Sequence, residues 1–107
     1  PLSFQPDLLS DTPVIPMDEV ETSYYLRMQV VDKPGVMAEI TRIVAEQKIS
    51  ISALLQKEAS DESDQVGIIL LTHATVEKNI NAAITRIEAL PVVTGKVFRL
   101  RIEELNN

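Results

Sequence analysis

Residues 24–41 read YYLRMQVVDKPGVMAEIT, and this stretch decides the fold. Over its first eight residues, side chains alternate so that Tyr24, Leu26, Met28 and Val30 share one apolar face, which is the period of a half-buried strand. After the Pro34–Gly35 pair, apolar residues recur at helical spacing as far as residue 47. The stretch therefore predicts a strand that turns directly into an amphipathic helix.

The joint between this strand and this helix has the chemistry of a small-anion site. We expect Asp32 to cap the helix and Pro34 to lie in its first turn. The first N–H groups of a helix have no partner within the helix, and they lie at its positive end. A free amino acid needs such donors for its carboxylate and an acceptor for its ammonium group. A small anionic or zwitterionic metabolite is therefore the first ligand to consider.

The rest of the chain continues the alternation of strand and helix patterns. Residues 49–58 predict a second strand, and a polar, acidic connection at 59–64 leads to a nearly continuous apolar strand at 65–72. In the second strand the alternation places four apolar side chains on one face, namely Ile49, Ile51, Ala53 and Leu55.

A second helix and a last strand complete the pattern. Thr75 is the expected N-cap of the helix, Glu77 lies in its first turn, and Pro91 ends it. Residues 92–103 predict the last strand, in which Gly95 marks a kink or bulge.

The order strand, helix, strand, strand, helix, strand predicts an α+β, ferredoxin-like fold. In this fold the strands form a four-stranded antiparallel sheet in the order 4-1-3-2, with both helices on one face. The second strand is then an edge, and the other sheet face has no helix to cover it. An open edge and a partly apolar open face predict self-association.

Composition divides the 107 residues into two parts. Residues 1–22 hold four of the six prolines and five acidic residues with no base, and they read as a linker. Residues 23–107 hold the remaining 11 acidic residues and all 10 bases, so they account for only −1 of the net charge of −6. We expect residues 23–107 to form one domain and residues 1–22 to be a proline-rich linker.

Several function classes are disfavoured by the sequence. The nearly neutral domain has no field to attract nucleic acid or an anionic membrane, and no apolar run is long enough for a membrane span. There is no cysteine, so disulfides and thiolate chemistry are excluded. The single histidine, His73, has no catalytic partner in the sequence near it. We therefore expect no catalytic, metal-binding or cofactor-binding residues in this chain and a cytoplasmic location.

The stretch from Tyr25 to Ile40 resembles the opening of an ACT domain, a regulatory module that senses amino acids. The resemblance extends over residues 20–104. Its further ACT motifs include Ile87-Glu88-Ala89-Leu90. The combination with Leu55-Gln56-Lys57 and Leu71-Thr72-His73 is similar to the C-terminal ACT domain of the bacterial homoserine dehydrogenases. Those enzymes interconvert aspartate semialdehyde and homoserine with NAD(P), on the route to threonine and methionine.

The resemblance implies feedback inhibition by a small amino acid, with L-threonine as the first candidate, and a homodimer or higher homo-oligomer. Effector is then expected between the first strand–helix loop of one copy and the second strand of another. Asp32 corresponds to a polar residue that contacts the effector amino group, Gly35 to a glycine at a close approach, and Val36 and Met37 to backbone donors. Ser50 stands where several relatives have asparagine, and Ser52 is a second candidate on the same strand. The resemblance also implies that residues 1–22 lead from a missing catalytic domain, which would hold any NAD(P) site.

Two interpretations stay open at this point. The domain either binds an amino acid effector or only holds catalytic subunits together. An enzyme or RNA-binding module of the same fold is disfavoured, because the chain lacks stacking aromatic residues, a Cys-x-x-Cys pair and an arginine in the strand–helix loop.

Overall fold

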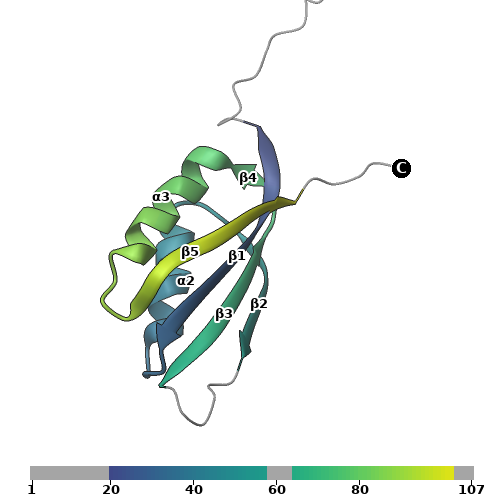
Figure 1. Ribbon diagram of the computed structural model, residues 1–107. Coiled ribbons are helices and arrows are strands. Elements are labelled where there is room, and N and C mark those ends of the chain that lie inside the picture. The colour runs from purple at the N-terminus through teal and green to yellow at the C-terminus, as the bar shows by residue number, and fades with distance from the viewer. Residues whose placement is uncertain (1–19, 58–63, 103–107) are drawn as a thin grey trace, which may run out of the picture.

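The computed structural model describes residues 20–57 and 64–102. The elements follow the order β1 (Glu21–Val31), α2 (Val36–Glu46), β2 (Ile51–Lys57), β3 (Gln65–Thr72), β4 (Thr75–Val76), α3 (Glu77–Glu88) and β5 (Val93–Ile102). The predicted βαββαβ order is confirmed, with the two-residue strand β4 as an addition (Figure 1).

The sheet has the predicted topology. β1 lies in the centre and pairs antiparallel with β3 and β5, and β3 pairs antiparallel with β2, so β2 is an edge strand. Both helices cover the same face of the sheet, and no described element covers the other face (Figure 1). The short β4 pairs with Glu21 and Thr22 at the beginning of β1.

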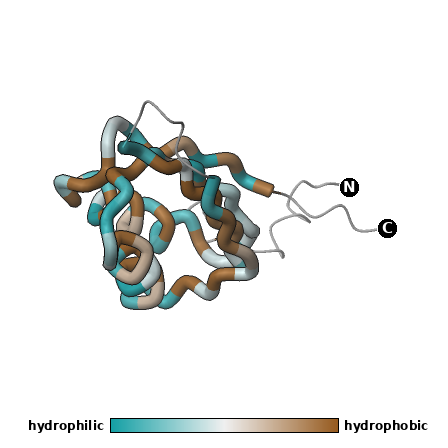
Figure 2. Tube along the Cα trace, turned by 90° about the horizontal axis from the view of Figure 1, so that it is seen from below, coloured by the Kyte–Doolittle hydropathy of each residue, from teal (hydrophilic) through white to brown (hydrophobic). Residues whose placement is uncertain are grey.

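The core lies between the sheet and the two helices. Tyr24, Leu26, Met28 and Val30 are all buried, which confirms the face predicted for the first strand. Figure 2 shows the two layers from below, with apolar segments along the strands and both apolar and polar segments in the helices. The helices contribute the buried residues Val36, Ile40, Ile43, Val44, Ile80, Ala83 and Ile87.

The predicted helix caps are wrong at both helices. Gly35 is the N-cap of α2 and Val76 the N-cap of α3, and neither helix has a side-chain cap hydrogen bond. Asp32 lies three residues before Gly35, and Pro34 lies in the turn ahead of the helix. Thr75 belongs to β4, because pairing with the start of β1 extends its backbone, and its hydroxyl accepts a hydrogen bond from Asn79 Nδ2 at 3.5 Å.

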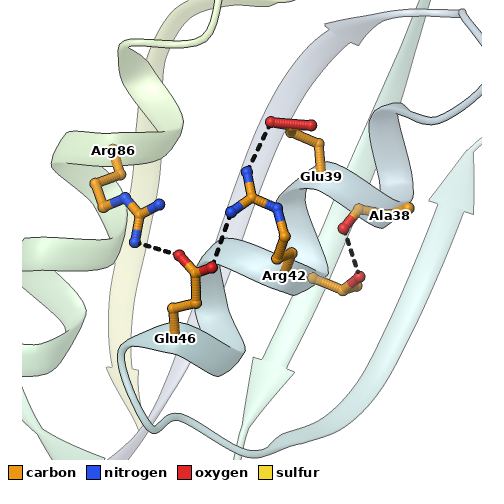
Figure 3. A network of polar contacts seen from close by, with 6 residues as sticks. Ala38, Glu39, Arg42, Glu46 and Arg86 are labelled. Atoms are coloured by element: carbon orange, nitrogen blue, oxygen red, sulfur yellow. Dashed lines mark hydrogen bonds and ion pairs between the residues drawn. The ribbon is translucent and has the colours of Figure 1, made fainter.

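An ion-pair network joins the two helices on their exposed side (Figure 3). Within α2, Arg42 contacts Glu39 and Glu46 at 2.9 Å each, and Glu46 also contacts Arg86 of α3 at 2.7 Å. Hydrogen bonds from Arg86 and then from Arg42 hold the pKa of the Glu46 carboxyl below its ordinary value. Hydrogen bonds to Glu39 and Glu46 raise the pKa of the Arg42 guanidinium.

The predicted face of the second strand is wrong beyond Ile51. The register with β3 shifts between Ile51, which pairs with Thr72, and Ala53, which pairs with Leu71. This bulge at Ser52 reverses the alternation, since one extra residue exchanges the two faces of a strand. Leu54 consequently packs against the core, and Leu55 is 58% exposed on the open face.

The open face of the sheet is partly apolar, as the sequence predicts. The large apolar side chains that remain exposed in the described residues come from β2 and β5, and they are Leu55, Phe98, Leu100 and Ile102. Phe98 also contacts the ring of Tyr25 edge-on, with centroids 6.2 Å apart.

Two sequence predictions lie wholly or mainly outside the described residues. They are the linker, of which the structure describes only residues 20–22, and the acidic connection at 59–64, of which it describes only Asp64. No helix in the described part of the chain is long and apolar enough to cross a membrane.

Candidate functional site

The corner where β1 leads into α2 is built around a left-handed glycine. Gly35 has φ 88° and ψ −11°, a conformation that costs glycine little and other residues more. A Cβ built on Gly35 meets no atom within 4 Å. Within this chain, the glycine is therefore required by the backbone turn and not by close packing.

The corner presents two free backbone donors. The Val36 amide bonds to the carbonyl of Lys33 at 3.4 Å, and the Glu39 amide bonds to the carbonyl of Gly35 at 3.0 Å. The amides of Met37 and Ala38 have no acceptor among the described residues. Since these N–H groups lie in the first turn of an 11-residue helix, they form a positive end suited to a carboxylate.

Charged side chains of both signs lie beside these donors. Asp32 and Lys33 are exposed, and neither has an ion-pair partner within the described ranges. The Asp32 amide bonds to the carbonyl of Asp64 at 2.7 Å, which fixes the end of β1 beside the start of β3. Free amides, a carboxylate and an ammonium group together complement the charges of a zwitterion.

A small hollow lies against the corner, on the helix side of the sheet. Its volume is about 70 Å³, and it is lined by residues of the corner, by Gln56 of β2 and by Val66 and Ile68 of β3. Ligand pockets usually have volumes of about 300–1,000 Å³. This hollow by itself is therefore smaller than an ordinary ligand pocket.

The structure brings four of the six predicted site residues together. Asp32, Gly35, Val36 and Met37 all line the corner hollow. Ser50 and Ser52 lie at the opposite end of the sheet, where the Ser50 carbonyl accepts a hydrogen bond from the His73 amide and Ser52 lies in the bulge. Within a single chain, these serines do not meet the corner.

Gln56 is the polar lining residue that sequence reasoning missed. It lies near the end of β2, one residue before Lys57, and Lys57 pairs with Gly67 near the start of β3. β1 and β2 run in the same direction, because each is antiparallel to β3. The end of β2 therefore lies near the end of β1. The predicted strand order already implied this proximity, so it could have pointed to Gln56.

The described residues hold no group of three or more His, Cys, Asp or Glu side chains that could bind a metal ion. His73 is exposed just beyond the end of β3, where its amide bonds to Ser50.

The family model for the ACT domain matches residues 24–92, and the chain belongs to this family. ACT domains are regulatory domains that bind small amino acids and commonly form oligomers. The fold agrees with the ACT domain of a GTP pyrophosphokinase from Chlorobium tepidum, with a TM-score of 0.61 at 18% identity over 75% of this chain and 99% of that chain.

The similarity extends to homoserine dehydrogenases, as the sequence predicted. The chain is 56% identical to homoserine dehydrogenase from Methylobacillus glycogenes over 98% of its own length and 26% of that protein. The crystal structure of a homoserine dehydrogenase from Thiobacillus denitrificans matches with a TM-score of 0.81 and 57% identity, over 96% of this chain and 22% of that chain. The chain thus spans about a quarter of the length of the curated relatives that it matches.

Proposed function

We propose that this chain is the C-terminal regulatory domain of a homoserine dehydrogenase and that it binds L-threonine for feedback inhibition. The observation that carries the proposal is the pair of free amides at Met37 and Ala38 beside the exposed Asp32 carboxylate. In this proposal the amides bind the amino acid carboxylate, and Asp32 binds its ammonium group. The NAD(P)-dependent reaction belongs, in this proposal, to the part of a cytoplasmic enzyme that lies outside this chain.

We infer that a second copy completes the site, because the corner hollow by itself has a volume of only about 70 Å³. We propose a homodimer in which the edge strands β2 of the two copies pair. In a pair whose two-fold axis is perpendicular to the sheet, the two strands are antiparallel and the helices of both copies lie on the same side. If the pairing is centred near the middle of β2, Ser50 and Ser52 of one copy lie opposite the end of β2 in the other copy, near Gln56 and the corner.

The alternative is an assembly domain that binds no effector. The observations that favour it are the small hollow and the position of Ser50 and Ser52 far from the corner of the same chain. In that case the domain only joins the catalytic subunits, and amino acids leave it unchanged.

Isothermal titration calorimetry distinguishes these two functions. We expect L-threonine to bind to the 107-residue chain more tightly than other amino acids in a panel. Asp32→Asn should weaken binding at least tenfold, because a hydrogen bond to a charged group contributes about 1.5–3 kcal/mol. Glu21→Gln, which removes an exposed carboxylate at the far end of β1, is the control and should leave the affinity unchanged.

Two results would contradict the proposed site. Absence of heat with every amino acid at millimolar concentration, from a chain that is dimeric in sedimentation, would support the assembly function. Equal affinities of the wild type and Asp32→Asn would place the ligand away from the corner.

A further inference from the structure

The open face of the sheet contains a second hollow, which is larger and basic. It has a volume of about 440 Å³ and lies on the side of the sheet opposite the helices. We call it the basic hollow and define it by Arg27, Gln29, Lys57, Gly67, Lys96 and Phe98. Its volume falls within the usual range of small-molecule sites, about 300–1,000 Å³.

Cross-strand register explains why the surface is concave at this place. Lys57 of β2, Gly67 of β3 and Gln29 of β1 form one row across the sheet. Gly67 contributes no side chain to the middle of this row, and a Cβ there would lie 3.4 Å from Gln29 Nε2 and 3.8 Å from Lys57 Cβ. The hollow therefore lies over a glycine between two long polar side chains.

An irregularity in β5 brings the third cation to the hollow. Arg27 pairs with Phe98 and Gln29 pairs with Thr94, so the register between β1 and β5 shifts across this segment. Gly95 within it has φ 77°, in the left-handed region that glycine tolerates best. The next residue, Lys96, lines the basic hollow opposite Lys57.

Among the described residues, the charges that line the basic hollow have one sign. Arg27, Lys57 and Lys96 line it, and no acidic residue of ranges 20–57 and 64–102 does. None of the three cations has an ion-pair partner within residues 20–57 and 64–102. The two arginines of β5, Arg99 and Arg101, differ in this respect, because both contact Glu77 on the helix side of the sheet.

Arg27 is held in place by an aromatic ring instead of a carboxylate. Its guanidinium carbon lies 4.8 Å from the centroid of the Phe98 ring. A cation–π contact of this kind orients the guanidinium group and leaves its N–H groups free for an anion.

We propose that the basic hollow binds a small organic or inorganic anion with at least two negative charges, of the polycarboxylate or phosphate class. Arg27, Lys57 and Lys96 bind the charges, the Gln29 amide adds a donor, and Ile69 and Phe98 form the apolar part of the lining. This site lies on the other sheet face from the corner, so it does not depend on the proposed amino acid site.

A small anion fits these observations better than a second copy of the sheet face does. Two such faces in contact at this place would bring cations against cations, which is unfavourable in a desolvated interface. An acidic polypeptide would satisfy the charge, and it is therefore included as a separate outcome of the test.

The test uses amide NMR spectra and calorimetry of the 107-residue chain with pyrophosphate and with citrate at low ionic strength. Acetate serves as the single-charge control. We expect both polyanions, but not acetate, to bind and to shift the amide signals of Gly67, Lys57 and Phe98. The affinity should fall as salt is raised to about 0.15 M, because exposed charges are screened.

Variants that each remove one lysine charge, inside or outside the basic hollow, test whether the polyanion binds there. Lys57→Gln and Lys96→Gln should each weaken polyanion binding about fivefold, as expected for an exposed charge pair. Lys78→Gln removes the same charge from the exposed surface of α3 and should change nothing. L-Threonine should neither compete with the polyanions nor lose affinity in these variants.

Three outcomes would overturn the proposal. The first is no polyanion binding at millimolar concentration, and the second is equal weakening by Lys78→Gln. The third is binding of a tetraglutamate peptide without binding of pyrophosphate or citrate, which would assign the surface to an acidic polypeptide.

Discussion

Two residues in the left-handed region shape the ends of α2. Gly35 begins the helix at φ 88°, and Lys48 follows it at φ 62°. At the C-terminal end the Ile49 amide bonds to the Val44 carbonyl and the Lys48 amide to the Ala45 carbonyl, which is the Schellman motif. In this motif glycine is the usual residue at the position of Lys48, so the chain has glycine at only one of two strained positions.

Exchanging residue types at these two positions should shift stability in opposite directions. Gly35→Ala should lower the free energy of unfolding by about 1 kcal/mol, because a Cβ disfavours the left-handed conformation. Lys48→Gly should raise it by a similar amount, about 1 kcal/mol, for the same reason. Urea unfolding measures both variants, and a Gly35→Ala chain as stable as the wild type would contradict the role assigned to the turn.

The two helices are joined by a polar contact in addition to their apolar packing. Glu46 of α2 accepts hydrogen bonds from Arg42 in its own helix and from Arg86 in α3 (Figure 3). The network is exposed, so its contribution is small and decreases with salt. Its pH dependence follows from the lowered pKa of Glu46.

The pH dependence of the stability of a Glu46→Gln variant tests this contact. Because the folded pKa of Glu46 lies below the unfolded value, its stabilisation is fully present above the unfolded pKa. It is lost as the pH falls through the folded pKa. Thermal unfolding should therefore show a lower Tm for Glu46→Gln than for the wild type near about pH 7, and the difference should disappear near about pH 2. A difference that is the same at both pH values would show that the ion pairs do not cause it.

The whole domain leaves two surfaces uncovered by described elements, the β2 edge and the open sheet face. The edge carries unpaired backbone groups, and the open face carries the exposed side chains Leu55, Phe98, Leu100 and Ile102. In the proposed dimer, pairing through this edge would also bring a second copy next to the corner hollow. We therefore assign the proposed dimer to β2.

Amide hydrogen exchange at different chain concentrations tests this dimer. Exchange in β2 should slow as the concentration rises through the monomer–dimer transition measured by sedimentation, because inter-chain pairing satisfies the outer N–H groups of this strand. Amides in the middle of α3 are the control and should exchange at a constant rate. A dimer that forms without slower exchange in β2 would place the interface elsewhere.

Much of the fold follows from local sequence patterns. The alternation of Tyr24, Leu26, Met28 and Val30 predicts their burial, and the spacing of Val36, Ile40, Ile43 and Val44 predicts the buried side of α2. These predictions hold because one strand or helix buries its apolar face whatever its neighbours are. The strand order and the Asp32–Met37 corner also follow from the sequence, through the order of the elements and the resemblance to ACT domains.

Other features were decided only by the tertiary structure. The bulge at Ser52 depends on how β2 pairs with β3, and it moves Leu55 from the core to the open face. Thr75 joins a strand instead of capping α3 because the start of β1 is beside it. The basic hollow needs Arg27, Lys57 and Lys96 from three strands, which come together only through cross-strand register. A sequence pattern reports the environment of one element, whereas bulges, shared hollows and pairing partners depend on contacts between elements that lie far apart in the chain.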